Sequence, residues 1–400
     1  MVSISERAQT IQASPIRRLV PLADAAKKQG KTVYHLNIGQ PDIPTPEPMV
    51  RAIQTFDHKV ISYGHSEGLL DLRIEIAKYF QRYGIPIKTE EVLVTIAGSE
   101  AIHFAFCAVA DVGDEIIIPE PFYTNYNGFA TFAQVKIVPV TTKAEEGFHL
   151  PPMSEIEAKI TSRTRAILLC SPNNPTGTIY TPEELAGVAE LVRRHNLFLI
   201  GDEVYKEFAY DGQTHMSILE LPGLEDRTIV ADSISKRFSA CGARIGCLVC
   251  RNPKVIESIT RFAQARLCPQ TVEQVAAVAA YRMDPAYFDP IREEYQRRRD
   301  AMYEACQSIE GLVLKKPRGA FYMLAKLPIP DADDFARWLL TDYDLNHETV
   351  MVAPGNGFYA TPGLGEDEIR LAYVLNVESI RRAMKVLEEG LKQYRTERNL

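Results

Sequence analysis

The chain has 400 residues, of which 46% are hydrophobic and 24% charged, and a net charge of −7. That length predicts about two domains with ample chain to bury a large sheet, and the composition is typical of a soluble globular protein. Charges of both signs are interspersed, which argues against a nucleic-acid stripe or a polybasic membrane patch and favours a small-molecule partner.

The N-terminus shows no basic segment followed by an apolar core, and no apolar run approaches the roughly 20 residues that span a bilayer. We therefore expect a cytoplasmic protein. The seven cysteines are an odd number and fit reduced thiols better than a disulfide framework. Cys247 and Cys250 form a C-x-x-C pattern, but a strand there points them to opposite faces, so we expect no metal site.

From residue 91 onward, short apolar segments typical of strands alternate with helical segments. The predicted strands are 91–96, 115–118, 135–140, 165–170, 197–200, 228–231 and 245–249. One helix, 182–195, has a clear start, because Thr181 and Glu184 form a capping box around Pro182. This alternation predicts an α/β fold with a mainly parallel sheet covered by helices on both faces.

The pattern changes after about residue 285. A long charged helix is predicted over 291–309, followed by strands at 321–324, 349–352 and 369–374 and helices at 333–340 and 378–394. These elements predict a smaller α+β domain. We divide the chain into residues 1–45, the N-terminal part of the small domain, 46–290, the large domain, and 291–400, the rest of the small domain.

The most informative stretch surrounds Lys236, which is predicted to lie in a polar loop between the strands 228–231 and 245–249. Small hydroxyl and glycine residues leave room beside its amine, and Arg244 supplies a planar donor fork suited to phosphate. An amine together with a phosphate anchor suggests pyridoxal phosphate, whose aldehyde forms a Schiff base with a lysine. Taken alone, the Ser-x-Ser-Lys motif is weak, and a solvated surface lysine is the commoner interpretation.

Other loops at the same edge of the sheet, where ligands bind in open α/β folds, carry suitable partners. Asp202 follows a buried strand, and a pyridinium nitrogen would compensate its charge; the alternative is a turn cap. Tyr205 and Asn174 could bind the ring hydroxyl, although the Asn174 loop also reads as an ordinary turn. Tyr123 could lie flat on the ring, or belong to the core.

A phosphate cradle is predicted where a helix opens after the strand 91–96. The backbone amides of Gly98, Ser99 and Glu100 would line it, because the N-terminus of a helix presents free N–H groups. A lone glycine turn is the alternative interpretation.

Taken together, these motifs resemble the fold type I pyridoxal-phosphate aminotransferases, the class I/II family that includes aspartate aminotransferases. The matching stretches are Asn174–Gly177, Asp202–Tyr205, and Ser233-x-Ser235-Lys236 with Arg244, in the family's order and spacing. The resemblance covers nearly the whole chain. It implies a large domain with a seven-stranded-type sheet, a smaller α+β domain, a homodimer, and transfer of an amino group from an L-amino acid to a 2-oxo acid such as 2-oxoglutarate.

The resemblance also implies roles. Lys236 would be the Schiff-base lysine and proton shuttle, Asp202 would hold the pyridinium nitrogen, and Tyr205 would complete the catalytic set. The implied cofactor ligands are Gly98, Ser99, Glu100, Tyr123, Asn174, Asp202, Tyr205, Ser233, Ser235, Lys236 and Arg244, with Tyr63 reaching the phosphate of the neighbouring subunit. The implied substrate ligands are Gly39, Asn174 and Arg370, the last clamping the α-carboxylate.

Two other functions use the same motifs. A carbon–sulfur β-lyase on this fold would look nearly identical in sequence. An aminotransferase-like regulator would need a DNA-binding extension, and the roughly thirty residues before the segment 33–38 are too few and too weakly basic for one. No motif identifies the residue that reads the substrate side chain, so aspartate, alanine and aromatic amino acids all remain open as donors.

Overall fold

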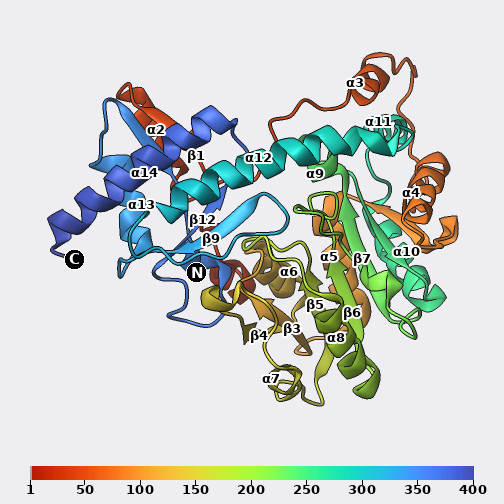
Figure 1. The fold of residues 1–400 in the computed structure, drawn as a ribbon. Helices are drawn as coiled ribbons and strands as arrows, with labels where there is room; N and C mark the ends of the chain where they lie inside the picture. The colour runs from red at the N-terminus through yellow and green to blue at the C-terminus, as the bar shows by residue number, and fades with distance from the viewer. Residues whose placement is uncertain (1) are drawn as a thin grey trace.

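The computed structural model describes residues 2–400, and its centre is a seven-stranded sheet (Figure 1). The strand order is β2-β8-β7-β6-β5-β3-β4. All neighbours are parallel except β8, which runs antiparallel to β2 and β7. The bounds are β2 Val92–Thr95, β3 Glu115–Glu120, β4 Lys136–Thr141, β5 Thr164–Cys170, β6 Phe198–Asp202, β7 Thr228–Ser233 and β8 Gly246–Cys250. The predicted α/β fold and seven-stranded sheet are confirmed.

Helices cover both faces of this sheet. Successive side chains of each strand point to opposite faces, and both sets are mostly apolar, so each face needs a cover. One core joins one face to α5 (Ala97–Val109), α6 (Asn125–Ala133) and α10 (Pro253–Arg266). The other core joins the opposite face to α4 (Leu70–Arg82), α8 (Pro182–Arg194) and α11 (Thr271–Tyr281). Cys247 belongs to the second core and Cys250 to the first, so the two thiols point to opposite faces as predicted.

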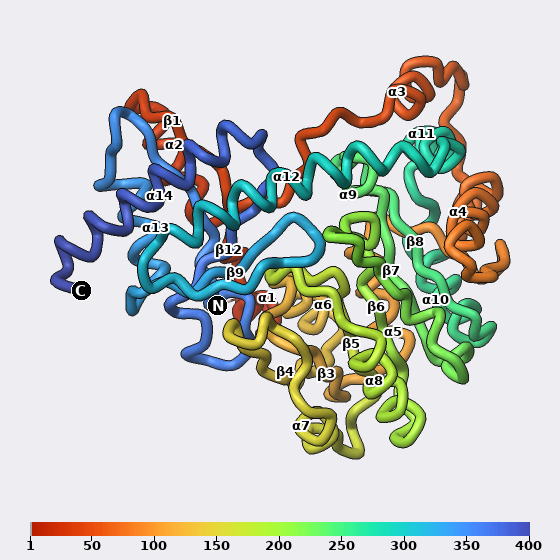
Figure 2. Tube along the Cα trace, in the orientation of Figure 1, coloured from red at the N-terminus to blue at the C-terminus, as the bar shows by residue number. Residues whose placement is uncertain are grey.

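A second layered unit contains both ends of the chain. Strand β1 (Thr32–His35) pairs in parallel with β10 (Glu348–Met351), and β12 (Glu368–Ala372) lies between β9 (Tyr322–Lys326) and β11 (Ala353–Pro354). The helices that pack here are α2 (Val20–Lys28), α12 (Phe288–Gln307), α13 (Ala332–Thr341) and α14 (Val377–Arg398). Figure 2 shows the red N-terminal segment beside the blue C-terminal one.

Helix α12 runs from a core of the large sheet into the core of the second unit, which also takes in Phe208 and Tyr210. Phe288, at the start of α12, belongs to a large-domain core, whereas Ile291 and Met302 further along the helix belong to the core of the second unit. The division at about residues 45 and 290 remains a proposal. Four further helices are short or peripheral: α1 (Glu6–Thr10), α3 (Glu47–Gln54), α7 (Met153–Glu157) and α9 (Ile234–Arg237).

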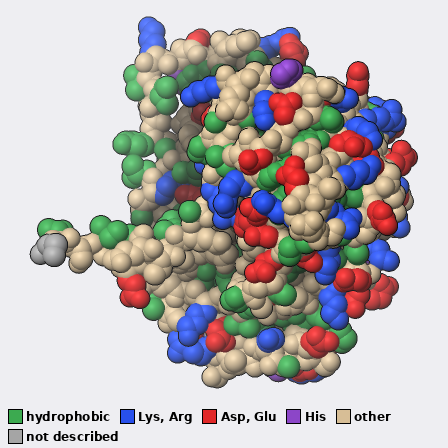
Figure 3. Space-filling model, turned by 90° about the vertical axis from the view of Figure 1, so that its left-hand side faces the viewer, with side chains coloured by type: hydrophobic (Ala, Val, Ile, Leu, Met, Phe, Trp, Pro, Cys, Tyr) green, Lys and Arg blue, Asp and Glu red, His purple; other side chains and the backbone are tan. Residues whose placement is uncertain are grey.

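The surface carries mixed charges. On the face turned toward the viewer in Figure 3, acidic and basic side chains alternate. Within residues 2–400 no helix is both long and apolar enough to cross a membrane.

Candidate active site

The site is built at the carboxyl ends of β5, β6 and β7, where three loops meet. The strand register places Cys170, Asp202 and Ala231 side by side across these strands. The segments that follow them contain Asn174, Tyr205 and Lys236. Because the three strands are parallel, their following segments emerge at one edge of the sheet, as the sequence predicts.

Lys236 lies on a one-turn helix, α9 (Ile234–Arg237), and not in the polar loop that was predicted. Ser233 ends β7 and caps this turn, since its Oγ accepts a hydrogen bond from the Ser235 amide at 3.1 Å. The Lys236 Nζ donates to the Gly39 carbonyl at 3.0 Å and lies 3.8 Å from the Cys241 Sγ. The amine therefore sits where the N-terminal segment meets the large sheet.

Asp202 ends β6 and is only 7% exposed. Its Oδ2 accepts a hydrogen bond from the Tyr126 hydroxyl at 2.6 Å, and no ion pair reaches it from residues 2–400. Burial raises its pKa to about 6, although the bond from Tyr126 acts in the opposite direction. Its Oδ1 also accepts from the Val204 amide at 3.4 Å, so the carboxyl group caps the turn that follows β6.

The phenol of Tyr205 is buried and lies 2.9 Å from the hydroxyl of Tyr322, which comes from β9 of the small domain. The Lys236 Nζ lies 6.0 Å from the centre of the Tyr205 ring. Tyr123 adjoins the same group: its ring centre is 5.6 Å from that of Tyr126, and burial raises its pKa, with Lys236 acting against that rise.

Arg370, on β12, is 2% exposed. Its Nη1 donates to the Asn174 Oδ1 at 3.0 Å and its Nη2 donates to the Asn37 carbonyl. Its Nε has no hydrogen-bond partner among the described residues. The guanidinium lies over the rings of Tyr322, at 4.5 Å, and Phe358, at 4.9 Å. A buried guanidinium with a free donor is suited to bind a carboxylate.

The predicted phosphate side is formed where α5 begins beside β7. A Cβ added to Gly98 would lie 3.3 Å from the Val204 Cγ1 and 3.9 Å from the Ser233 Cβ, which shows how closely the helix start approaches that strand. The Oγ atoms of Ser233 and Ser235 are 2.8 Å apart. The first amides of α5, at Gly98, Ser99 and Glu100, lack partners within the helix by its geometry.

Glu100 and Arg244 have further contacts. The Glu100 carboxylate accepts from the Ile96 amide at 2.8 Å and from the Arg266 Nε at 3.1 Å, so its side chain is engaged and only its amide could face a phosphate. Arg244 adopts a left-handed backbone with φ of 53° and donates from Nη1 to the Cys241 carbonyl at 3.0 Å.

Tyr63, the ligand predicted to come from a neighbouring subunit, lies on an exposed segment of the chain. Its side chain is 82% exposed, beside Val60 at 71% and Ile61 at 66%. An aromatic residue so exposed within an apolar segment is typical of a surface that another chain covers.

Sequence reasoning missed Tyr126 and Tyr322. Tyr126 lies three residues after Tyr123, which is about one turn of a helix. That spacing was a signal that the two side chains lie on the same side of the segment. Tyr322 lies in a segment that was correctly predicted as a strand, but its contacts join residues more than 100 positions apart, which no local pattern reveals.

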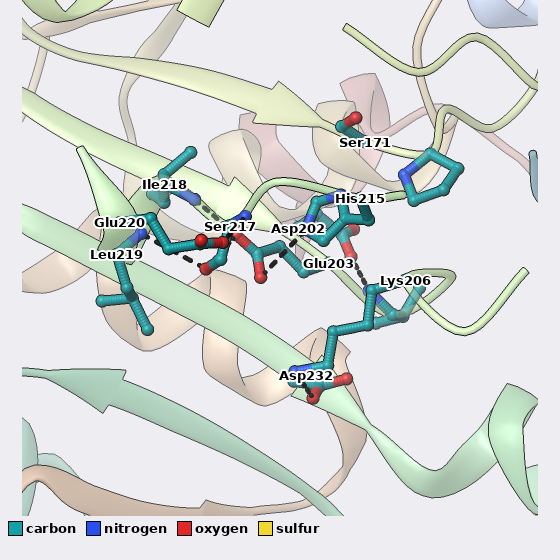
Figure 4. A network of polar contacts seen from close by, with 12 residues as sticks. Ser171, Asp202, Glu203, Lys206, His215, Ser217, Ile218, Leu219, Glu220 and Asp232 are labelled. Atoms are coloured by element: carbon teal, nitrogen blue, oxygen red, sulfur yellow. Dashed lines mark hydrogen bonds and ion pairs between the residues drawn. The ribbon is translucent and has the colours of Figure 1, made fainter. Parts of the chain in front are cut away.

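A second layer of polar contacts lies behind these residues (Figure 4). The Glu203 Oε1 accepts from the Ser217 Oγ and from the Ile218 amide, both at 2.9 Å, and its Oε2 lies 3.2 Å from the His215 Nε2. The Lys206 Nζ lies 3.3 Å from the Asp232 Oδ2. The side chains next to Asp202 and Tyr205 in sequence are thus anchored on the side away from the site.

The residues fit pyridoxal phosphate. They provide an amine, a buried carboxylate without a cation, a helix start with free amides beside two serine hydroxyls, and a buried guanidinium with a free Nε. Among residues 2–400 no group of three His, Cys, Asp or Glu side chains is arranged to hold a metal ion.

Comparisons with known proteins agree with this geometry. Residues 31–387 match the family described as Aminotransferase class I and II. The aspartate/prephenate aminotransferase of Thermus thermophilus is 33% identical, over 96% of this chain and 98% of that protein. The aromatic-amino-acid aminotransferase 2 of Thermococcus litoralis is 31% identical, over 98% of this chain and 99% of that protein.

A solved structure of alanine aminotransferase from Pyrococcus furiosus superposes with a TM-score of 0.88 at 33% identity, covering 98% of this chain and 100% of that one. Fold, family match and relatives all lead to the same assignment. The chain belongs to the class I and II aminotransferases, pyridoxal-phosphate enzymes of fold type I.

Proposed function

We propose that this aminotransferase moves the amino group of an L-amino acid to a 2-oxo acid, with 2-oxoglutarate as the acceptor and Lys236 as the reacting amine. The observation that carries the proposal is the approach of Lys236 and Arg370 to the linked phenols of Tyr322 and Tyr205, the latter three residues beyond the buried Asp202. An amine, a carboxylate without a cation and a free carboxylate-binding group are the parts that amino transfer needs.

When bound, pyridoxal phosphate supplies an aldehyde and a protonated ring that accepts the electron pair released at the substrate Cα. Asp202 would accept a hydrogen bond from the ring nitrogen and keep that nitrogen protonated. Lys236, whose Nζ is oriented by the Gly39 carbonyl, would take the proton from the substrate Cα and return it as general acid. Arg370 would bind the substrate α-carboxylate through its free Nε and one of its Nη atoms, beside Gly39.

Tyr205 and Asn174 would bind the ring oxygen of the cofactor. Because the Asn174 Oδ1 already accepts from Arg370, its Nδ2 is the donor left to face the ring and, as predicted, the substrate. Tyr123 would lie against the ring face. The residues that would hold the phosphate are Ser233, Ser235, Arg244 and the amides of Gly98, Ser99 and Glu100.

The half-reaction tests this function. Protein loaded with cofactor and given one amino acid without a 2-oxo acid should release one 2-oxo acid per site and then stop, with the absorbance of the amine form. Adding 2-oxoglutarate should restart it, and a panel of aspartate, alanine and aromatic donors would identify the preferred substrate. Lys236→Ala is the control and should give no turnover. Sustained release of ammonia and pyruvate would contradict the proposal and favour a β-lyase.

We further propose a homodimer in which Tyr63 reaches the phosphate of the partner's site, which its exposure and apolar neighbours support. Tyr63→Phe should weaken cofactor affinity by about 1.5–3 kcal/mol, typical of a hydrogen bond to a charged group. Mixing Tyr63→Phe with Lys236→Ala subunits should give more activity than the two homodimers summed, because mixed dimers contain one intact site. A fully active monomer in sedimentation would contradict the shared site.

Residence in the cytoplasm stays a prediction.

A further inference from the structure

Tyr322 is the residue at which the small domain meets the catalytic groups. It is 2% exposed and lies on β9, directly opposite Ala372 of β12. Leu324, two residues further along, lies opposite Arg370. Tyr322 and Arg370 are therefore diagonal neighbours on the same face of an antiparallel pair, within reach of each other.

The ring and the hydroxyl of Tyr322 make different contacts. The guanidinium of Arg370 lies 4.5 Å from the centre of the ring, a distance at which the ring face attracts a cation. The hydroxyl lies 2.9 Å from that of Tyr205, which belongs to the large domain. One side chain thus touches both the proposed carboxylate clamp and the proposed ligand of the ring oxygen.

The direction of the bond between the two phenols follows from their proton count. Each hydroxyl has one proton to donate. If Tyr205 donates its proton to the cofactor's ring oxygen, then Tyr322 must donate to Tyr205. Because hydrogen bonds in a chain polarise one another, a bond donated by Tyr322 would make Tyr205 a stronger donor to the ring oxygen.

Gly39 supports the same conclusion from the other side. A Cβ at position 39 would lie 1.8 Å from the Tyr322 Oη and 2.2 Å from its Cζ. The segment that orients Lys236 therefore passes directly over this hydroxyl, and only a glycine leaves room for it. Tyr322 is fixed against three parts of the site at once: Gly39, Tyr205 and Arg370.

We propose that Tyr322 is a positioning residue with two separable functions: its hydroxyl polarises the phenol of Tyr205, and its ring holds the guanidinium of Arg370 in place. The inference rests on the proposed function, in which Tyr205 binds the ring oxygen and Arg370 the substrate carboxylate. It assigns this strand residue a part in both cofactor tuning and substrate binding.

Two variants separate the functions. Tyr322→Phe keeps the ring and removes the hydroxyl, so kcat should fall by about fivefold to tenfold, the size of one lost hydrogen bond, while KM for the amino acid changes less than twofold. The apparent pKa of the bound cofactor's absorbance should rise, because the ring oxygen loses support for its anionic form. Tyr322→Leu should show the same change and also raise KM by about fivefold or more.

Tyr343→Phe is the matched control. Tyr343 is also buried in the small domain, stacks on Trp338 and donates one hydrogen bond to the Val386 carbonyl at 3.0 Å, but its contacts lie away from the site. It should change unfolding temperature about as much as Tyr322→Phe and leave the absorbance titration as in the parent.

An unchanged titration in Tyr322→Phe would overturn the role of the hydroxyl, and an equal rise in KM for the Phe and Leu variants would overturn that of the ring. If Leu does not fold, the Phe variant still tests the first part, and Tyr322→Trp, which keeps an aromatic face, tests the second by its KM. A parent protein that fails the half-reaction would refute the proposed function instead.

Discussion

Two buried aspartates at the ends of neighbouring strands have opposite surroundings. Asp232, near the end of β7, is 0% exposed and pairs with Arg237 and Lys206. Asp202, at the end of β6, is 7% exposed and has only a phenol and an amide as hydrogen-bond donors among the described residues. The two carboxyl groups share burial and differ in the presence of cations.

The pKa values of the two carboxyl groups differ in direction for this reason. Burial acts to raise both, but Arg237 and Lys206 bring the pKa of Asp232 below its usual value, whereas that of Asp202 is raised to about 6. Asp232 is neutralised within the chain and serves the architecture. Asp202 lacks that neutralisation, which a pyridinium nitrogen would provide. The contrast separates a structural ion pair from the carboxyl group that we propose as a cofactor ligand.

The largest effect should come from Asp202→Ala. We expect this variant to retain substantial cofactor through the phosphate ligands but to lose about 10²–10⁴-fold in kcat, because the ring nitrogen would no longer be held in its protonated form. Absorbance and single-turnover assays would measure both. Asp226→Ala, at an exposed aspartate, is the control and should leave both unchanged. Near-normal turnover in Asp202→Ala would show that Asp202 is only a turn cap.

Asp232→Asn should reduce stability without a direct effect on chemistry. It would leave Arg237, which lies 4.4 Å over the Tyr79 ring, and Lys206 as buried cations without a carboxylate. We expect the free energy of unfolding to fall by about 3–5 kcal/mol, measured in urea. Asp226→Asn breaks an exposed pair and should cost about 0–1 kcal/mol. Equal losses in the two variants would refute the contrast between the aspartates.

The pH dependence of stability should show the smallest of the three effects. Since Asp202 has a raised pKa when folded, the native state binds more protons than the unfolded state between about pH 4 and pH 6, and its stability falls as pH rises through that window. In protein freed of cofactor, Asp202→Asn should remove about 3 kcal/mol of this decline, at ~1.4 kcal/mol per pKa unit. Parallel curves for parent and variant would contradict the raised pKa.

Much of this could be predicted from the sequence, for physical reasons. Buried parallel strands are short apolar runs that end in ligand-bearing loops, so Asp202, Asn174 and Lys236 could be proposed as site residues from several local motifs in one order, together with the family resemblance. What could not be predicted depends on distant pairing. Tyr322 meets Tyr205, and Tyr126 meets Asp202, only because separate segments pack together. The one-turn helix at Lys236 was missed because four residues are too few to show helical periodicity.

The close approach of Gly39 to Tyr322 limits how this pocket can evolve. Any side chain at position 39 would overlap the tyrosine hydroxyl, at 1.8 Å from its Cβ. A lineage or a mutant library can therefore enlarge residue 39 only after position 322 has become smaller. The reverse order passes through a clashing intermediate, so the two positions should change in a fixed sequence, and screens that vary residue 39 alone will miss every pocket shape that needs a smaller residue at position 322.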